Sequence, residues 1–145
     1  MPTTDAATIR DLLCRVRTIA LVGASDKPNR PSHDVMAYLQ GRGYRVIPVS
    51  PRLAGGELLG ERVYRSLADI PEAVDMADLF LAPGRVPPVV GEAIERHIPV
   101  VWMQIGVIHP DAAEQAEQAG LTVVMDRCPR QEIPRLGVPP VQTGN

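Results

Sequence analysis

The stretch that most constrains the fold is residues 18–32, where an apolar run ends at a glycine and a helical pattern begins soon after. Thr18 to Val22 is apolar almost throughout, which is typical of a strand buried in a parallel sheet. The loop GASDKPNRPS follows it and leads to a helical pattern from about Ser32. A strand, a loop free of bulky side chains and a helix start are the parts that hold a phosphate. The stretch therefore predicts a strand–loop–helix unit with a candidate anion site.

Strands and helices alternate along the rest of the chain. The expected strands are residues 18–22, 44–49, 76–81, 99–105 and 121–125, and the expected helices are 4–16, 32–42, 88–97 and 110–120. Such alternation predicts parallel βαβ units with right-handed crossovers. We expect an α/β fold: a Rossmann-like, doubly wound parallel sheet of about five to six strands in three layers. The expected strand order is near 3-2-1-4-5-6, with the first strand central.

The length and composition fit one domain with an aliphatic core. The chain has 145 residues, of which 45% are hydrophobic and only 3% aromatic. Residues 1–138 are expected to form this domain, and 139–145 a flexible tail that ends a proline-containing segment from Pro129.

Several classes of function and location are disfavoured by the same sequence. A net charge of −2 argues against bulk nucleic-acid binding. No apolar run approaches the roughly 20 residues that cross a bilayer, and the first residues lack the pattern of a signal peptide. Two distant cysteines, Cys14 and Cys128, indicate neither a disulfide framework nor a zinc site. We expect a cytoplasmic protein without a bound metal.

The loop after the first expected strand is the first candidate site. Its candidate residues are Gly23, Ala24, Ser25, Lys27, Arg30, Pro31 and Ser32. The small residues are expected to leave backbone N–H groups approachable, and the two cations add charge-assisted bonds of about 1.5–3 kcal/mol each. The alternative is an ordinary strand–helix loop with a capped helix, because neither the G-x-G-x-x-G fingerprint nor a Walker A motif is present.

The second candidate site is Ser50-Pro51-Arg52, at the end of the second expected strand. NAD-binding domains carry an acidic residue there for the ribose hydroxyls, and none stands here. Arg52 instead suits a ribose with its own phosphate, either the 3′-phosphate of coenzyme A or the 2′-phosphate of NADP. The alternative is a solvated surface arginine.

A third group follows the last expected strand, in the segment DRCPRQE (126–132). Arg127 and Arg130 flank Cys128, and nearby cations favour the thiolate, which would allow nucleophilic or redox chemistry. The alternative is a buried small hydrophobe. Gln104, at the end of its strand, either points to a ligand or only satisfies backbone groups.

Taken together, these residues resemble the small bacterial and archaeal CoA-binding proteins, which are similar to the N-terminal CoA-binding domain of the succinyl-CoA synthetase alpha subunit. The likeness runs from Thr18 to Val138. It lies in ALVGASDKPNRPS (20–32), GYRVIPVSPRLAGGELLGERVYRSLADIP (43–71), VDMADLF (74–80), VWMQIGV (101–107) and GLTVVMDRCPRQEIPRLGV (120–138).

The resemblance implies CoA at the carboxyl edge of the sheet, with its phosphates by residues 23–32 and its nucleotide near Ser50 to Arg52. Two residues depart from the family pattern: Leu81 stands where an arginine often follows the phenylalanine, and Arg130 where a lysine is common. The first departure removes the charge from any contact at Leu81, and the second keeps the charge.

The function expected from these observations is a stand-alone CoA or acyl-CoA binding protein that is not catalytic by itself. The phosphohistidine and ATP-grasp parts of the synthetase lie outside the matched domain, so ligase activity is not expected. The alternatives are an NADP-binding oxidoreductase or sensor, and a thiol or acyl-transfer role through Cys128. The acyl group, protein partner and oligomeric state stay open.

Overall fold

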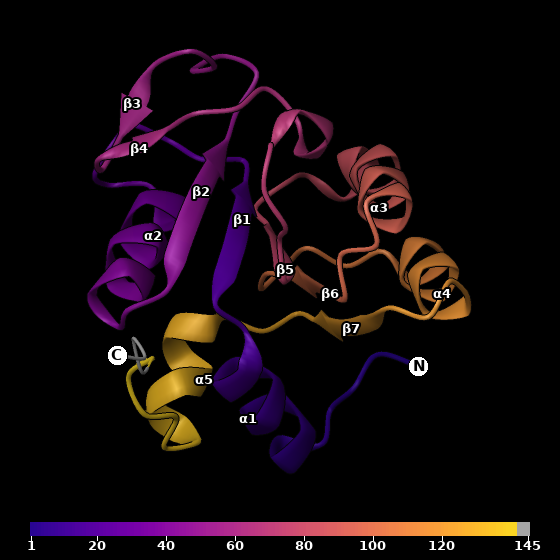
Figure 1. The fold of residues 1–145 in the computed structure, drawn as a ribbon. Helices are drawn as coiled ribbons and strands as arrows, with labels where there is room; N and C mark the ends of the chain where they lie inside the picture. Colours follow the sequence, from indigo (N-terminus) through magenta and orange to yellow (C-terminus); the bar gives the residue numbers. More distant parts are fainter. Residues whose placement is uncertain (142–145) are drawn as a thin grey trace.

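The protein is described here by a computed structural model that covers residues 1–141; residues 142–145, the end of the expected tail, lie outside the described part. A parallel sheet runs through the molecule with helices on both faces (Figure 1). Its strands are β1 (Thr18–Val22), β2 (Arg45–Val49), β5 (Met76–Leu79), β6 (Val100–Met103) and β7 (Thr122–Met125). The α-helices are α1 (Ala6–Arg15), α2 (Pro31–Gly41), α3 (Val86–Glu95), α4 (Pro110–Gln118) and α5 (Pro129–Arg135).

The sheet has five strands in the order β2-β1-β5-β6-β7, all parallel, so the expected fold class is confirmed. The expected strand order is confirmed for the five strands that form, which lie in the predicted succession. Within residues 1–141, the sixth strand expected outside β2 does not form, so β1 lies second from the edge and not at the centre. The connection after β2 instead forms a small hairpin of β3 (Glu57–Leu58) and β4 (Glu61–Arg62), and only an isolated bridge joins Tyr64 to Val49. The sheet order reverses beside β1, and this crossover point is where doubly wound folds bind ligands.

Each edge of the sheet is partly covered by an irregular segment. At β2, the Tyr64 amide donates to the Pro48 carbonyl at 3.1 Å, and the Ser50 amide donates to the Tyr64 carbonyl at 2.9 Å. At β7, the Thr3 amide donates to the Val123 carbonyl at 2.8 Å. Pro48 is tolerated because it lies in an edge strand, where a missing donor breaks no inner ladder.

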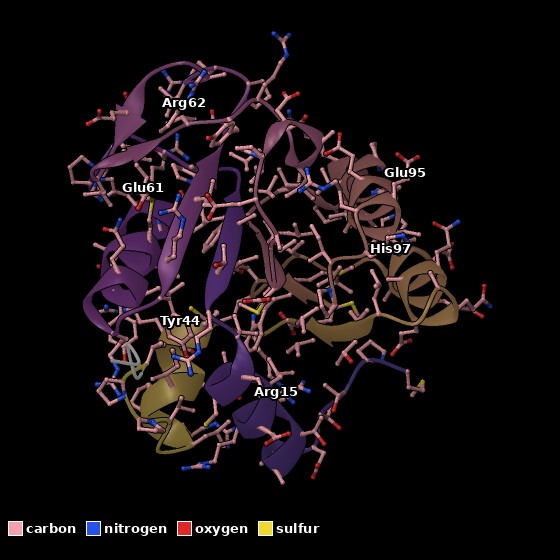
Figure 2. The ribbon with its side chains drawn as sticks, in the orientation of Figure 1. Arg15, Tyr44, Glu61, Arg62, Glu95 and His97 are labelled. Carbon is pink, nitrogen blue, oxygen red and sulfur yellow. The ribbon has the colours of Figure 1, made fainter. Side chains whose placement is uncertain are left out.

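Two aliphatic cores fill the spaces between the sheet and its helices. One face is covered by α1, α2 and α5, and the other by α3, α4 and the 3₁₀ turn η1 (Leu67–Asp69) (Figure 1). Trp102 of β6 is fully buried on the first face, as expected for a core residue. Tyr44, at the start of β2, donates its hydroxyl to the Leu13 carbonyl of α1 at 2.6 Å (Figure 2). Burial raises the pKa of Tyr44 to about 12, so the hydroxyl keeps its proton, and this bond, even in mildly alkaline solution.

The helix boundaries differ from expectation in three places. Asp5, not Thr4, caps α1, because its carboxylate accepts from the Thr8 amide at 3.0 Å. Helix α3 begins at Val86, two residues before the expected start. Helix α5 was not expected, because its sequence contains Pro134; Pro129 at its first position and the burial of Ile133 allow this short helix. Within residues 1–141, no helix is both long enough and apolar enough to cross a membrane.

A single arginine holds the turn η1 against helix α3. Nη1 of Arg96 donates to the carbonyls of Leu67, Ala68 and Ile70 at 2.9, 3.2 and 2.7 Å, and its Nη2 donates to the Glu72 carbonyl at 3.1 Å. Carbonyl groups near the end of a helical turn have no partner in the turn itself, so the guanidinium satisfies them.

We expect Arg96→Ala to lower the free energy of unfolding by about 2–4 kcal/mol, because it removes several charge-assisted bonds at once. Urea denaturation followed by far-UV circular dichroism would measure this. Arg96→Lys is the matched control: it keeps the charge but lacks the planar fork, so it should recover less than half of the loss. Equal stability of the wild type and Arg96→Ala would show that η1 holds without this contact.

Candidate functional site

Two adjoining cavities open at the carboxyl edge of the sheet. The main cavity, about 1190 Å³, lies over the loops after β1, β5, β6 and β7. The side cavity, about 920 Å³, lies between the loops after β1, β2 and β5. Gly23, Ala24, Arg52, Phe80 and Leu81 line both, so the two spaces form one continuous depression. The main cavity alone is as large as the roughly 300–1000 Å³ that small-molecule sites commonly occupy.

The structure brings the sequence-predicted residues together around this depression. Those that line the main cavity are Gly23, Ala24, Ser25, Lys27, Arg30, Pro31, Ser32, Arg52, Leu81, Gln104 and Cys128. Ser50 and Pro51 line the side cavity. Residues from five separate loops therefore meet at one place, as expected for parallel strands that all end at the same edge.

Gly23 turns the chain sharply at the end of β1. Its φ is +91°, and a Cβ on it would lie 2.0 Å from the Phe80 carbonyl oxygen, so no side chain fits there. The amides of Gly23 and Ala24 both donate to the Val49 carbonyl, at 3.0 and 3.1 Å. The expectation that these two N–H groups are free for a ligand is therefore wrong; they join the loop to β2.

The donors that this loop does offer come from two serines. The Ser25 amide has no partner within residues 1–141, and its hydroxyl oxygen accepts from the Lys27 amide at 3.1 Å. Ser32 stands in the first turn of α2, where amides lack helical partners, and α2 has no side-chain cap. Ser25 and Ser32 both line the main cavity, beside the positive end of α2.

Arg52 lies across the mouth of the site, in an ion pair with Asp26. Its Nη2 is 3.0 Å from Asp26 Oδ1, and both side chains are at least half exposed. The guanidinium lowers the pKa of Asp26 through this hydrogen bond. Arg52 lies at the edge of the sheet where the sequence predicted it, but the sequence reasoning missed Asp26, whose carboxylate offsets its charge.

Two further arginines line the side cavity and were not predicted. Arg65 follows the hairpin, and Arg85 belongs to the 3₁₀ turn η2 (Pro83–Arg85) that follows β5. Both are exposed, and within residues 1–141 neither guanidinium has a hydrogen bond or an ion pair. Arg85 stands in a loop already assigned to the carboxyl edge, so its charge was a signal that could have found it.

The far half of the main cavity is lined mainly by apolar side chains, and an exposed ion pair lies at its rim. Val35, Phe80, Ile105, Val107 and Pro134 supply its apolar surface. On its outer wall, Nε of Arg130 lies 3.2 Å from Asp34 Oδ2, and the same guanidinium lies 4.7 Å from the centre of the Tyr38 ring. These contacts join α5 to α2, so Arg130 has its charge engaged away from Cys128.

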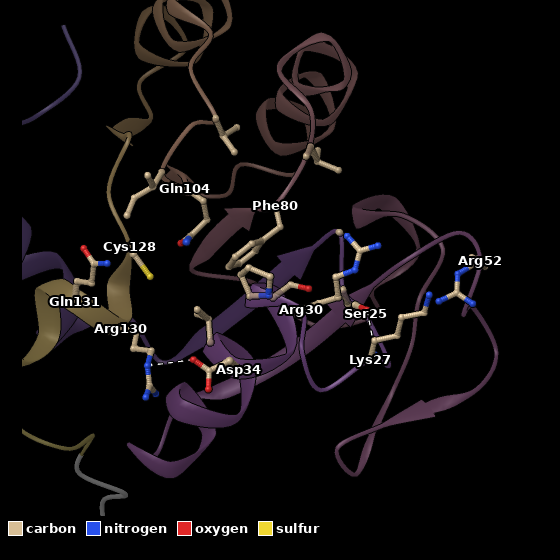
Figure 3. Close-up of a pocket in the computed structure, with 18 of the residues that line it drawn as sticks. Ser25, Lys27, Arg30, Asp34, Arg52, Phe80, Gln104, Cys128, Arg130 and Gln131 are labelled. Carbon is tan, nitrogen blue, oxygen red and sulfur yellow. Dashed lines mark hydrogen bonds and ion pairs between the residues drawn. The ribbon is translucent and has the colours of Figure 1, made fainter.

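Gln104 and Cys128 stand at the inner end of the apolar half (Figure 3). Both residues are buried, at 6% and 7% exposure, and both side chains point into the cavity. The loop that carries Cys128 is fixed by the Trp102 indole, which donates to the Arg127 carbonyl at 2.8 Å. The oxygen Oε1 of Gln104 is buried and has no partner in the described residues.

The three histidines are scattered. His109 caps α4 through its Nδ1, which accepts from the Ala112 amide at 3.0 Å. His97 follows α3 with φ of +54°, and His33 lies in the first turn of α2. In residues 1–141 no group of three or more His, Cys, Asp or Glu side chains is placed to hold a metal ion.

Asp78 of β5 lies in the sheet below the site and is fully buried. It stands beside Leu21 of β1 and Trp102 of β6 in the sheet register, and neither of its carboxyl oxygens has a partner in the described residues. Burial raises its pKa well above the usual value. The sequence signal was a single acidic residue inside an otherwise apolar strand.

A family model described as "CoA binding domain" matches residues 17–134. The uncharacterized protein YneT of Bacillus subtilis is 37% identical over 128 residues, covering 88% of this chain and 93% of its own length. The alpha subunit of an ADP-forming acetate–CoA ligase I from Pyrococcus furiosus is 32% identical over 95 residues. That match covers 63% of this chain but only 21% of the ligase subunit, so it concerns a small part of the larger protein.

Solved structures agree with the fold. A solved structure of a Thermus thermophilus protein is 40% identical, with a TM-score of 0.88, and the match covers 92% of this chain and 99% of the other. A hypothetical protein from Pyrococcus horikoshii is also 40% identical, with a TM-score of 0.89 and coverage of 94% and 96%. A dinucleotide-forming acetyl-coenzyme A synthetase from Korarchaeum, at 21% identity and a TM-score of 0.66, shares the fold over 75% of this chain and 26% of the synthetase.

Proposed function

The chain belongs to the CoA-binding domain family, and on that premise we propose that it binds coenzyme A or an acyl-CoA by itself, without catalysis of its own. In this proposal the phosphorylated nucleotide lies over the loops after β1 and β2, and the pantetheine arm enters the main cavity. The ligand is a small nucleotide, and the protein acts as a carrier or sensor of it.

The observation that carries the proposal is the polarity of the joined cavities. One end holds Lys27, Arg30, Arg52, Arg65 and Arg85, and the other is apolar and ends at Gln104 and Cys128. CoA has the same polarity, with three phosphate groups at one end and a long neutral arm ending in a thiol at the other. Cations and free amides suit phosphates, and an apolar cavity with few polar groups suits the arm.

Two details of the chain fit such a ligand. The Ser25 and Ser32 amides, at the start of α2, can donate to a pyrophosphate without breaking any internal bond. The buried, unpartnered Oε1 of Gln104 can accept from an amide N–H of the pantetheine arm. NADP would share the cationic end but has no flexible thiol arm to fill the apolar half, so the cavity favours CoA over that alternative.

The absence of catalysis is proposed because the thiol lacks a base. Within residues 1–141, none of the three histidines forms a hydrogen bond with Cys128. A cysteine that acts as a catalytic nucleophile through repeated turnovers generally needs a base within hydrogen-bonding reach or a strongly lowered pKa.

Isothermal titration with CoA and 3′-dephospho-CoA tests the proposal and the roles of the arginines. We expect CoA to bind at least about tenfold more tightly, because the 3′-phosphate meets guanidinium groups in the side cavity. Arg65→Ala and Arg85→Ala should each weaken CoA binding about tenfold and leave 3′-dephospho-CoA binding nearly unchanged. Arg52→Ala should act in the same direction but less, because Asp26 already offsets its charge.

The matched control is Arg15→Ala, which removes an exposed cation of α1 that lies outside both cavities. It should leave both affinities unchanged. Equal affinity of the wild type for the two ligands would remove the role of the side cavity. A failure of CoA to bind at all, while NADP raises the melting temperature, would replace the proposal with the NADP alternative.

A further inference from the structure

We propose that Cys128 forms a reversible mixed disulfide with the thiol arm of its ligand, so that the site can hold CoA covalently under oxidising conditions. This inference rests on the proposed function, because the ligand must first place its thiol end in the main cavity. It adds a redox activity to a site that would otherwise only bind.

The position of Cys128 is the first observation. Cys128 is 7% exposed, and its sulfur points into the inner end of the main cavity (Figure 3). A cysteine with this burial is hidden from proteins at the surface. A ligand that fills the main cavity from its cationic end therefore reaches Cys128 with its far end.

Gln104 supplies an independent observation that a polar ligand arm belongs at this place. Its side chain is 6% exposed and points into the same end of the main cavity, where Oε1 has no partner in the described residues. A buried acceptor left unpartnered costs about 1–3 kcal/mol, which an incoming N–H donor would recover. The pantetheine arm carries two amides and then its thiol, so an arm whose amide meets Gln104 brings its sulfur close to Cys128.

The chain contains a second cysteine that lacks these features. Cys14 is exposed on α1 and lines neither cavity. Because Cys14 is the exposed cysteine, a small disulfide that needed no binding site would react with Cys14 first. Selective reaction at Cys128 would therefore require binding in the main cavity, and this makes Cys14 an internal control.

The chemical step is thiol–disulfide exchange, with the symmetric disulfide of CoA as the second reactant. The Cys128 thiol loses its proton to solvent, and its sulfur attacks one sulfur of the CoA disulfide. The bond between the two CoA sulfurs breaks, a bond between Cys128 and one CoA forms, and the other CoA leaves as a thiolate that takes up a proton. No net oxidation occurs, and a free thiol in excess reverses the step.

The test is intact-mass spectrometry after incubation with CoA disulfide, followed by peptide mapping. We expect one CoA adduct per chain, located at Cys128, whose rate saturates with the disulfide concentration and falls when 3′-phosphoadenosine 5′-phosphate competes for the cationic end. Cys14→Ser should react like the wild type, and Cys128→Ser should not react. Serine is a favoured N-cap, so Cys128→Ser should keep helix α5.

The outcomes separate this inference from the proposed function. If titration shows CoA binding but Cys128 stays unmodified, or if Cys14 reacts instead, the covalent step is wrong while the binding function stands. If CoA binds neither in titration nor as an adduct, the proposed function itself fails. An adduct at Cys128 that forms equally fast with cystine, and without competition, would also overturn the inference, because it would require no ligand site.

Discussion

Replacing Gly23 with alanine should unfold most of the protein or leave it severely destabilised. A Cβ at this position would lie 2.0 Å from the Phe80 carbonyl oxygen and 2.9 Å from its carbon, and both belong to backbone that cannot rotate away. Gly23 also has a φ of +91°, which costs about 1–2 kcal/mol for a residue with a side chain. We expect a total loss above about 3 kcal/mol, a large share of an ordinary domain's stability.

The control for Gly23→Ala is Gly55→Ala. Gly55 has the same φ of +91°, but a Cβ there would meet nothing within 4 Å. Its substitution should cost only the conformational strain, about 1–2 kcal/mol. Urea denaturation of both variants separates the clash from the strain, and similar losses at the two positions would show that β1 and β5 can move apart at low cost.

Replacing Asp78 with asparagine should make the protein gain stability relative to the wild type as the pH rises. Burial raises the pKa of Asp78 well above 3.8, its ordinary value. At pH values below the ordinary pKa, the Asp78 carboxyl is protonated in both the folded and the unfolded protein, so its titration does not change the stability. Between the ordinary and the raised pKa the folded protein keeps a proton that the unfolded chain has lost, so wild-type stability falls as the pH rises.

Within that window the advantage of Asp78→Asn should grow by about 1.4 kcal/mol for each pH unit. Urea denaturation of both proteins at successive pH values above the ordinary pKa measures the difference, in which the other titrating groups cancel. Asp11→Asn, at an exposed position of α1, should run parallel to the wild type. A constant difference between Asp78→Asn and the wild type would mean that the Asp78 carboxyl is hydrated or paired in solution.

The fold class could be predicted from the sequence because each inner strand is a short apolar run followed by a helical pattern. The order of the five strands could be predicted as well, but the structure of residues 50–66, where a sixth strand was expected, could not. Their Gly55-Gly56 turn was visible, but the choice between a further sheet strand and a separate hairpin depends on contacts with β2. Helix α5 was missed because Pro134 argues against a helix unless tertiary packing, here of Ile133, outweighs it.

The site was predictable where a loop follows directly from a strand. Gly23, Ser50 and Gln104 stand at strand ends, and topology alone brings them together. Pairing within the site was not predictable. Val49 accepts from the amides of Gly23 and Ala24, and Asp26 binds Arg52, because of loop shapes that no local pattern encodes.

The covered margins of the sheet have a consequence for how copies of this chain behave when crowded. Unpaired strand margins are templates on which further chains add by β-pairing. Here Tyr64 and Pro48 interrupt one margin, and Thr3 occupies an acceptor on the other. Pairing of strands between molecules is therefore disfavoured at both edges of the sheet. Aggregation by this route in concentrated solution would first require Thr3 or the segment around Tyr64 to detach from the sheet.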